Sequence, residues 1–297
     1  MEVIECYDLG GTNIRGALVA NNRPEIILSK SVRTARGNKK RILKQILEIS
    51  AFLRGSNEKV IAVSLGVPGP VVDGIMQKSP PLNLSNSLDF SSELSRELKE
   101  PIYVDNDLNS AARAELHMGI GKTVKNFNLL AIGTGIGVGI IIDGKLLGGA
   151  CGEFGHDVLE RNPKLANKCS CGKSGCWVAM ASGYGIEQTT NKEIGKVTTE
   201  GLFELYESGN PIAKKIVDRT RDYNAHGIGN ILNAFSPDVL VVMGTVGLKQ
   251  FNNIIPRAKE IKKYTINRIP KIMPTKLGEK IGIFGAYFVF KEKKHKC

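Results

Sequence analysis

Two segments share one pattern that limits what the chain can fold into: a strand, a turn rich in glycine and threonine, and a second strand. Residues 3–19 read VIECYDLGGTNIRGALV, and residues 127–142 read FNLLAIGTGIGVGIII. Apolar runs on either side of a glycine-rich turn are typical of β-hairpins. We expect each hairpin to open one lobe and the two tips to face a cleft, where small ligands usually bind.

The rest of the chain alternates between strand-like and helix-like segments. The predicted elements are a strand at 25–32, a helix at 39–53, a strand at 59–68, a helix at 91–99, a strand at 101–107 and a helix at 108–118, then helices beginning near 183, 198 and 211, a strand at 238–244 and a helix beginning near 248. This mixture implies layered α/β lobes. At 297 residues the chain is long enough for two of them.

The composition is typical of a folded, soluble protein, with 42% apolar and 24% charged residues. The net charge of +12 invites a nucleic-acid partner, but the lysines are scattered and the only dense basic run is 291–296. The longest apolar runs are rich in glycine or too short to span a bilayer, and the first residues are acidic where a signal peptide needs basic ones. We therefore expect a cytoplasmic protein with no membrane or nucleic-acid partner.

Three of the six cysteines lie within eight residues, in the segment CSCGKSGC. Cys169 and Cys171 are too close for comfortable disulfide geometry, and the cytosol keeps thiols reduced, so a disulfide is the weakest interpretation. Three thiolates with two glycines between them can wrap around a small ion. A tetrahedral, structural zinc site would be completed by a histidine thirteen residues before the first cysteine. Its ligands would be His156, Cys169, Cys171 and Cys176. The alternative is a loop of free cysteines without a metal.

Three turns combine glycine with threonine at the ends of predicted strands: DLGGT at 8–12, GTGIGVG at 133–139 and MGTVG at 243–247. Their backbone N–H groups can approach the oxygens of a polyphosphate, and Asp8 can hold Mg²⁺ directly or through water. The candidate residues are Asp8, Gly10, Gly11, Thr12, Thr134, Gly135, Gly244, Thr245 and Gly247. For DLGGT alone, a hairpin turn without a ligand is the alternative.

The segment YVDNDLNSAA follows a predicted strand and starts a predicted helix. Asp105 and Asp107 point the same way at the strand end, while Asn106 points across. If Asp107 reaches the cleft, it can accept the proton of a sugar hydroxyl as that oxygen attacks a phosphoryl group. The alternative is that Asp107 only N-caps the helix.

A second polar pair, Glu153 and His156, lies in the segment GEFGH. An imidazole has two nitrogens, so one can bind zinc while the other donates to a substrate hydroxyl. We expect the cysteine loop to hold His156, and through it Glu153, in the geometry that binds a sugar.

Together these motifs resemble those of the ROK family, whose kinase members phosphorylate glucose, N-acetylmannosamine and similar hexoses with ATP. The resemblance runs through DLGGT, GVPGPV, DNDLNSAA, GTGIGVGI, GEFGH, CSCGKSGC, MGTVG and GIFGAYF, and so covers nearly the whole chain. It implies a two-lobed, actin-like or ribonuclease H-like fold. The implied lobes are a small one at 1–108, joined by a C-terminal helix at 285–297, and a large one at 109–284 with the zinc loop. A homo-oligomer, either a dimer or a tetramer, is implied as well.

The resemblance also implies roles for single residues. Asp107 resembles the family's catalytic base, and the three turns resemble its ATP-binding turns. The implied sugar contacts are Asn83, Asn106, Asp107, Glu153 and His156, and the implied zinc ligands are His156, Cys169, Cys171 and Cys176. One departure is Val178, where the family usually has a sugar-binding glutamate; losing this acceptor weakens or broadens recognition. Trp177 beside it either reshapes the same wall or packs in the core.

The resemblance therefore implies an ATP-dependent glucokinase that phosphorylates the 6-hydroxyl of glucose, with Mg²⁺ bound to ATP and a structural Zn²⁺. The alternatives are an N-acetylmannosamine kinase, a broad-specificity hexokinase or fructokinase, a polyphosphate- or ADP-dependent enzyme, and a sugar-binding regulator without catalysis. Because Val3 already begins the first strand, we expect no helix-turn-helix module before it. Cys6 and Cys151 are expected to be small buried residues, and Cys297 a tail thiol without a role.

Overall fold

The computed structural model describes residues 1–148 and 152–294, which form two compact units of mixed strands and helices. Of these residues, unit 1 holds 1–123, 139–148 and 276–294, and unit 2 holds 124–138 and 152–275. The predicted α/β class is confirmed, whereas the lobe boundaries at 108 and 284 stay a prediction. Cys151, Cys297 and the last three residues of the expected C-terminal helix lie outside the described residues.

Unit 1 is built on a five-stranded sheet with the order β3-β2-β1-β4-β7. Its strands are β1 (Glu2–Leu9), β2 (Asn13–Ala20), β3 (Ile26–Arg33), β4 (Lys59–Val67) and β7 (Ile102–Asn106). The first predicted hairpin is confirmed, because β1 and β2 pair antiparallel. β1, β4 and β7 run parallel, and their register places Asp8, Gly66 and Asp105 in one row. The DLGGT turn and the DND segment therefore leave the sheet at the same edge.

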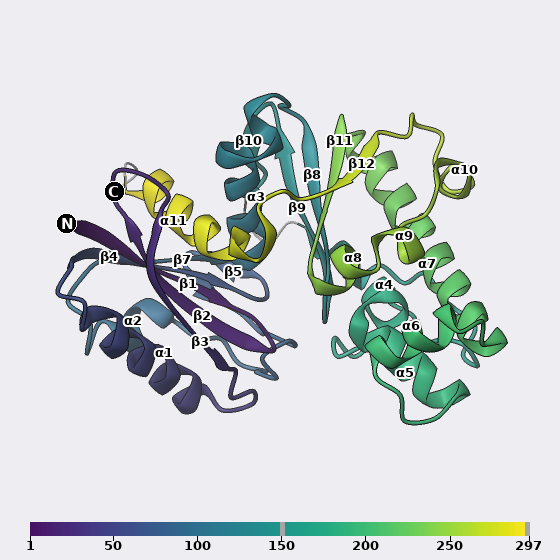
Figure 1. Ribbon diagram of the computed structural model, residues 1–297, viewed down its shortest axis with the longest axis horizontal. Coiled ribbons are helices and arrows are strands. Elements are labelled where there is room, and N and C mark those ends of the chain that lie inside the picture. The colour runs from purple at the N-terminus through teal and green to yellow at the C-terminus, as the bar shows by residue number, and fades with distance from the viewer. Residues whose placement is uncertain (149–151, 295–297) are drawn as a thin grey trace. The chain divides into compact units, whose positions relative to one another are not determined.

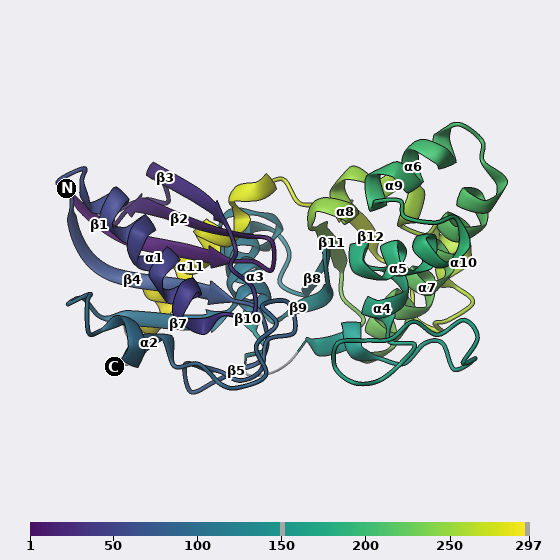
Figure 2. The same cartoon turned by 90° about the horizontal axis from the view of Figure 1, so that it is seen from below.

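Side chains alternate along β1, which gives the sheet two apolar faces. Tyr7 lies in the cluster packed by α1 (Lys39–Arg54). Cys6 lies in the cluster packed by α11 (Ile281–Lys293) and is fully buried, as expected. Figures 1 and 2 show α1 and α11 on opposite faces of this sheet, with α11 beside α3 (Asp107–Met118).

One predicted helix of unit 1 is too long. The prediction was 91–99, whereas α2 spans Phe90–Leu94. A serine hydroxyl competes with the helix at its end, since Ser95 Oγ donates to the carbonyl oxygen of Ser92 (3.1 Å). The following residues form turns instead. This unit also holds β5 (Val71–Val72), β6 (Ile75–Met76), η1 (Ile120–Lys122) and η3 (Gly278–Lys280).

The second sheet has the order β10-β9-β8-β11-β12, and the boundary between the units falls within β9. Its strands are β8 (Phe127–Ile132), β9 (Ile136–Ile142), β10 (Lys145–Leu146), β11 (Val239–Met243) and β12 (Lys271–Pro274). β11 runs parallel to β8 and β12. The second predicted hairpin is confirmed as β8 and β9, with the N–H of Gly133 donating to the carbonyl oxygen of Gly135 at its tip (2.9 Å).

The helices described in unit 2 all lie between β10 and β12 in the chain. They are η2 (Glu153–His156), α4 (Trp177–Ala181), α5 (Gly183–Glu193), α6 (Thr199–Glu207), α7 (Pro211–Phe235), α8 (Thr245–Lys249), α9 (Phe251–Ile254) and α10 (Ala258–Ile261). The helices predicted from 183, 198 and 211 are confirmed as α5, α6 and α7. The helix predicted from 248 begins earlier, at Thr245, because the carbonyl oxygen of Gly244 already accepts from the N–H of Leu248 (2.9 Å).

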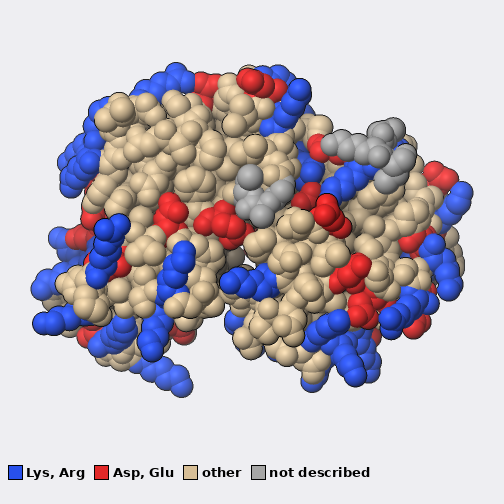
Figure 3. All heavy atoms as spheres, turned by 180° about the vertical axis from the view of Figure 1, so that it is seen from behind, with Lys and Arg blue, Asp and Glu red and all other residues tan. Residues whose placement is uncertain are grey.

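Lysine and arginine side chains are spread over the surface. On the face drawn in Figure 3 they form separate groups with acidic side chains between them. Several are paired, as Lys39 is with Glu93 (2.8 Å). Within the described part of the chain, no helix combines the length and the apolar character needed to cross a bilayer.

Candidate functional site

The four candidate metal ligands of unit 2 lie together. The ligand atoms of His156, Cys169, Cys171 and Cys176 are all within 4.8 Å of one another. Cys169 Sγ is 3.5 Å from His156 Nδ1, and Cys171 Sγ is 3.7 Å from Cys176 Sγ. Tetrahedral zinc with bonds of about 2.3 Å to sulfur and about 2.0 Å to nitrogen requires ligand separations of about 3.8 and 3.5 Å. The donor set and its spacing therefore fit a zinc ion.

Glycines let the cysteine loop turn this tightly. The N–H of Gly172 donates to the carbonyl oxygen of Cys169 (3.0 Å), and Gly172 has a φ of 97°. A Cβ at Gly175 would come 1.8 Å from the carbonyl oxygen of Glu160. The left-handed backbone at Gly172 favours glycine, and the close approach at Gly175 admits no side chain.

The three thiols differ in the direction of their pKa shifts. Burial raises the pKa of Cys169, and it raises the pKa of Cys176 to about 12. Burial acts the same way on Cys171, but hydrogen bonds from the Lys173 backbone and the other two thiols bring its pKa below the ordinary value. A bound cation would favour all three thiolates, which are the forms that bind metal.

Asn167 anchors the loop to the helices behind it and was missed from the sequence. It is 1% exposed; its Nδ2 donates to the carbonyl oxygen of Ala179 (2.9 Å), and its own carbonyl oxygen accepts from the N–H of Gly175 (2.9 Å). Lys192 Nζ donates to its Oδ1 (2.7 Å). An asparagine in a polar loop carries no signal of burial in the sequence, so nothing there could have identified it.

His156 presents its two nitrogens in different directions. Nδ1 faces the cysteines, whereas Nε2 lies 3.8 Å from Glu153 Oε2. Burial raises the pKa of the Glu153 carboxyl. Close packing of the GEFGH segment on β9 fixes both residues, because a Cβ at Gly155 would come 2.1 Å from the carbonyl oxygen of Ile136. Metal binding through Nδ1 would keep Nε2 on the side of Glu153.

Trp177 packs in the core, which decides between its two interpretations. Its side chain is fully buried, its Nε1 donates to Asn224 Oδ1 (2.8 Å), and a Cβ at Gly227 would come 2.3 Å from the ring. Val178, by contrast, is half-buried and lies near the 133–139 turn, where a Cβ at Gly135 would be 3.9 Å from its Cγ2. Of the two residues, Val178 is therefore the one that remains near the candidate site.

The two glycine-rich turns of unit 2 are neighbours. A Cβ at Gly133 would lie 4.0 Å from the backbone nitrogen of Thr245, the first residue of α8. Gly244 has a φ of 89°, and a Cβ there would come 2.5 Å from the carbonyl oxygen of Ile132. Glycine therefore allows the 243–247 turn to pack directly on the end of β8.

In unit 1, the DLGGT turn lies against the loop that carries Asn83. A Cβ at Gly11 would come 2.9 Å from the carbonyl oxygen of Pro81. Thr34 ties the turn to the next segment, since its Oγ1 donates to the carbonyl oxygen of Gly10 (2.7 Å). Asn83 itself has a φ of 55°, a conformation that asparagine adopts more readily than most residues.

Asp8 is half-buried and faces Arg15, its cross-strand partner, with Arg15 Nη1 3.4 Å from Asp8 Oδ2. Burial raises the pKa of Asp8, and Arg15 opposes part of that shift. The start of α11 also packs here, because a Cβ at Gly282 would come 2.3 Å from Asp8 Cγ. Sequence reasoning missed Arg15, although the pairing of a hairpin places oppositely charged residues opposite one another.

The junction between β7 and α3 assigns different roles to Asn106 and Asp107. Asn106 is the N-cap, because its Oδ1 accepts from the N–H groups of Leu108 (2.9 Å) and Asn109 (3.0 Å). Asp107 is the first helical residue and not the N-cap, but its Oδ1 also accepts from the N–H of Leu108 (2.9 Å). Asn106 Nδ2 also donates to the carbonyl oxygen of Gly69 (3.0 Å), which leaves its second amide hydrogen for another acceptor. Asp107, the first residue of α3, is half-buried.

The predicted site residues divide between the units. Unit 1 holds Asp8, Gly10, Gly11, Thr12, Asn83, Asn106 and Asp107, and unit 2 holds Thr134, Gly135, Glu153, His156, Cys169, Cys171, Cys176, Gly244, Thr245 and Gly247. Within unit 1 the structure places the 8–12 turn and the DND segment at one edge of a sheet. Within unit 2 it brings the two glycine turns together, and it clusters the four metal-ligand candidates.

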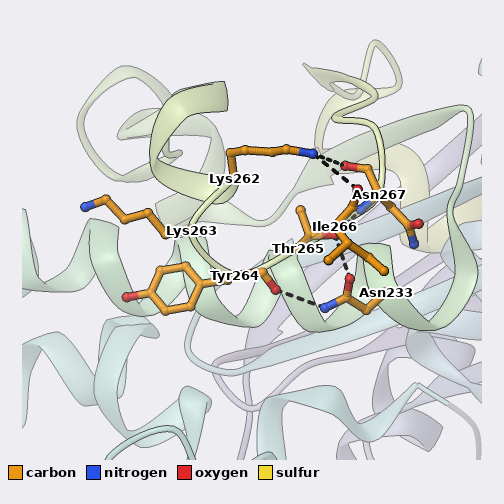
Figure 4. A pocket seen from close by; sticks show the side chains of 7 residues that line it. All are labelled: Asn233, Lys262, Lys263, Tyr264, Thr265, Ile266 and Asn267. Atoms are coloured by element: carbon orange, nitrogen blue, oxygen red, sulfur yellow. Dashed lines mark hydrogen bonds between the residues drawn. The ribbon is translucent and has the colours of Figure 1, made fainter.

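A surface pocket of about 540 Å³ lies elsewhere on unit 2 (Figure 4). It is lined by Asn233, Lys262, Lys263, Tyr264, Thr265, Ile266 and Asn267. Its polar groups largely satisfy one another: Lys262 Nζ donates to the carbonyl oxygen of Asn267 (3.2 Å), and Thr265 Oγ1 donates to Asn233 Oδ1 (2.7 Å). No residue predicted to bind sugar, nucleotide or metal lines this pocket.

Comparisons with known proteins agree with this arrangement. A glucokinase from Halalkalibacterium halodurans is 28% identical over 262 residues, covering 81% of this chain and 79% of the relative. An N-acetylmannosamine kinase from Pasteurella multocida is 28% identical, covering 84% and 86%. The crystal structure of a ROK hexokinase from Thermus thermophilus matches with a TM-score of 0.79 and 27% identity over 99% of each chain, which confirms the expected actin-like α/β fold. The ROK family model matches residues 4–293, and the chain therefore belongs to the ROK family.

Proposed function

We propose that the protein is an ATP-dependent hexose kinase that phosphorylates a 6-hydroxyl group, with glucose as the first candidate. The observation that supports the proposal is that Asn106 and Asp107 have different positions at the start of α3. Asn106 is the N-cap, and Asp107 is the first residue of the helix, with its Oδ1 accepting from the N–H of Leu108 (2.9 Å). The relatives named as a glucokinase and an N-acetylmannosamine kinase support sugar phosphorylation in general.

In the proposed reaction, Asp107 accepts the proton of the sugar hydroxyl. The sugar oxygen forms a bond to the γ-phosphorus as the bond from that phosphorus to the β–γ bridging oxygen breaks, and ADP leaves. Mg²⁺, when bound with ATP, neutralises charge on the phosphate oxygens. Asp8, with its pKa raised by burial and a single arginine partner nearby, is the proposed residue for holding that ion.

The proposed sugar contacts are Asn83, Asn106, Asp107, Glu153 and His156. Asn106 would act as a donor, because its Oδ1 already accepts two backbone N–H groups. His156 would act through Nε2, the nitrogen that faces away from the cysteines, and Glu153 would accept from a hydroxyl. The glycine turns at 8–12, 133–139 and 243–247 are the proposed contacts of ATP.

We assign the cysteine cluster to a structural zinc ion, held by His156, Cys169, Cys171 and Cys176. Four protein ligands leave no open position on the metal, so its proposed role is to fix the loop that carries Glu153 and His156. Thiolate ligands need a reducing compartment, which supports the cytoplasm as the proposed location. A dimer or tetramer remains the proposed assembly.

Glucose and N-acetylmannosamine are the two leading substrates. Val178 removes a carboxylate from the position where the family usually has one. A missing acceptor broadens a pocket rather than excluding glucose. A broad-specificity hexokinase or fructokinase is therefore the main alternative within the same reaction class.

The test is a coupled assay of ADP release with MgATP and a panel of hexoses, with polyphosphate as a second donor and zinc content measured in the same preparation. Asp107→Asn is expected to lower kcat by about 10²- to 10⁴-fold. Asp73→Asn, the same change at an exposed turn residue with a φ of 50°, is the matched control and should leave kcat within about twofold. No turnover with any sugar and either donor, in zinc-containing protein that binds a hexose, would replace the kinase proposal with a binding role.

A further inference from the structure

Asp105, which precedes the proposed contacts Asn106 and Asp107, has a place in unit 1 that the proposed function does not yet use. It is 8% exposed and lies one residue before the end of β7. Its Oδ1 accepts from the backbone N–H of Asn106 (2.8 Å). A carboxylate that accepts from the next residue's N–H fixes the direction in which the chain leaves the strand.

The other oxygen of this carboxylate is held by two cations. Arg113 Nη2 on α3 lies 2.9 Å from Asp105 Oδ2, and Lys293 Nζ on α11 lies 3.3 Å from it. Lys293 Nζ also donates to the carbonyl oxygen of Val104 (2.8 Å). The C-terminal helix thus reaches the end of β7 at two neighbouring residues.

Arg113 also forms an ion pair with an acid on α11. It is 7% exposed, and its Nε donates to Glu292 Oε2 (2.7 Å). Glu292 Oε1 lies 2.8 Å from His117 Nε2, also on α3. Two acids, Asp105 and Glu292, therefore face two basic side chains, Arg113 and Lys293, where β7, α3 and α11 meet.

The residues after Asp105 are equally constrained. Asn106 caps α3, donates to the carbonyl oxygen of Gly69, and accepts from Ser110 Oγ at its own carbonyl oxygen (2.7 Å). A Cβ at Gly66 would lie 3.4 Å from Asp107 Cα, so the neighbouring strand packs closely on the same turn. Asp107 therefore follows a residue, Asn106, whose backbone N–H and C=O groups are both hydrogen-bonded.

We propose that Asp105 is a positioning residue that sets the place of Asp107 through the N–H of Asn106, and that Arg113 and Lys293 hold Asp105 in place. The C-terminal helix becomes part of the support of the proposed base. This inference rests on the proposed function in assigning Asp107 its chemistry, but the ordering of the turn is a property of unit 1 alone.

The test compares Asp105→Asn with Glu100→Gln in the full-length protein. Glu100 precedes the same strand and forms a similar pair with Arg54 (2.9 and 2.8 Å). Glu100→Gln therefore removes one comparable acid at the opposite end of β7. Asp105→Asn should raise amide hydrogen exchange at residues 106–109 by about tenfold or more, and Glu100→Gln should not. It should also lower kcat by about 10- to 100-fold with KM within about threefold, which a general loss of stability would not do.

Equal exchange at 106–109 in the two variants would overturn the proposal, whatever the activities. A wild-type protein without turnover would overturn the proposed function instead, and the exchange comparison would still decide the positioning role. If Asp105→Asn does not fold, Lys293→Met serves as the test instead, because it removes the more distant cation (3.3 Å) together with its bond to the Val104 carbonyl oxygen and leaves Arg113 in place. Its expected effect is a rise in exchange of about threefold at the same amides, and no rise would overturn the proposal.

Discussion

The two units hold their candidate functional residues in different ways. In unit 1, Asn106 and Asp107 lie where a strand meets a helix, and a helix cap and ion pairs fix them. In unit 2, His156 ends a short 3-10 helix, and the chain from 157 to 176 consists mostly of turns and isolated bridges. Regular elements can position a side chain by themselves, whereas an irregular loop needs an added constraint such as a metal ion.

The largest expected effect is the loss of a candidate metal ligand in unit 2. Cys176→Ser should reduce bound zinc to a small fraction and strongly lower the melting temperature. Structural zinc contributes about 10–16 kcal/mol of apparent binding energy in small zinc domains, which sets the upper limit. Zinc content and thermal unfolding are the measurements. Ser170→Ala, an exposed neighbour in the loop, is the control, and a fully zinc-loaded Cys176→Ser protein would contradict the assignment.

The next effect should be confined to unit 1. Arg54→Met leaves Glu5, which is 0% exposed, without the guanidinium that lies 2.9 Å from it. Breaking a buried ion pair from one side costs about 3–5 kcal/mol of unfolding free energy. Urea unfolding measures this cost, and zinc content should stay unchanged. Lys44→Met, which breaks an exposed pair at 3.8 Å, is the control and should cost at most about 1 kcal/mol. Equal costs in the two variants would show that Glu5 is not dependent on Arg54.

A smaller effect concerns acid stability. Burial disfavours the charge of Glu292, but its bond to His117 and the nearby Arg113 hold its pKa below the ordinary value. The unfolded chain therefore takes up this proton first as the pH falls. The stabilisation is complete above the ordinary pKa of 4.5 and is lost as the pH falls through the lower folded value. Glu292→Gln should therefore reduce the slope of the unfolding free energy against pH on the acid side of 4.5. An unchanged slope in this variant would contradict the prediction.

The smallest expected effect is at Val178. If the proposed function holds, Val178→Glu restores a hydrogen-bond acceptor and should lower KM for the preferred hexose by about three- to tenfold, with kcat changed less. Val178→Leu keeps the apolar character and is the control. Identical KM values for every sugar in both variants would place residue 178 outside the sugar contacts.

Much of the fold was predictable because its signals are local. The glycines of DLGGT and GTGIGVG marked two hairpins, and both are present. The cysteine spacing and the scarcity of histidine together predicted the cluster of four ligand candidates. These features need only a few neighbouring residues to specify them, so one sequence was sufficient.

The features that were missed depend on residues far apart in the chain. The choice of Asn106 over Asp107 as N-cap depends partly on Gly69, which the Asn106 amide also reaches. Charges such as Glu5 and Arg54 look like surface residues until the fold buries them against each other. Trp177 is next to a candidate site residue in the sequence, but in the structure it packs in the core. There its ring lies against Gly227 and its Nε1 donates to Asn224 Oδ1, both on α7.

The order of the chain within unit 1 bears on how the protein is made. Residues 1–123 leave the ribosome first, but α11, which covers one face of their sheet and supplies Lys293 to Asp105, is synthesised about 160 residues later. Until then, Ile4 and Cys6 lack the helix that packs against them. At about 5–20 residues per second, this apolar face waits at least several seconds, time in which a chaperone can bind it. Unit 2 has a shorter delay, because β11, the parallel partner of β8, is synthesised about 110 residues after β8.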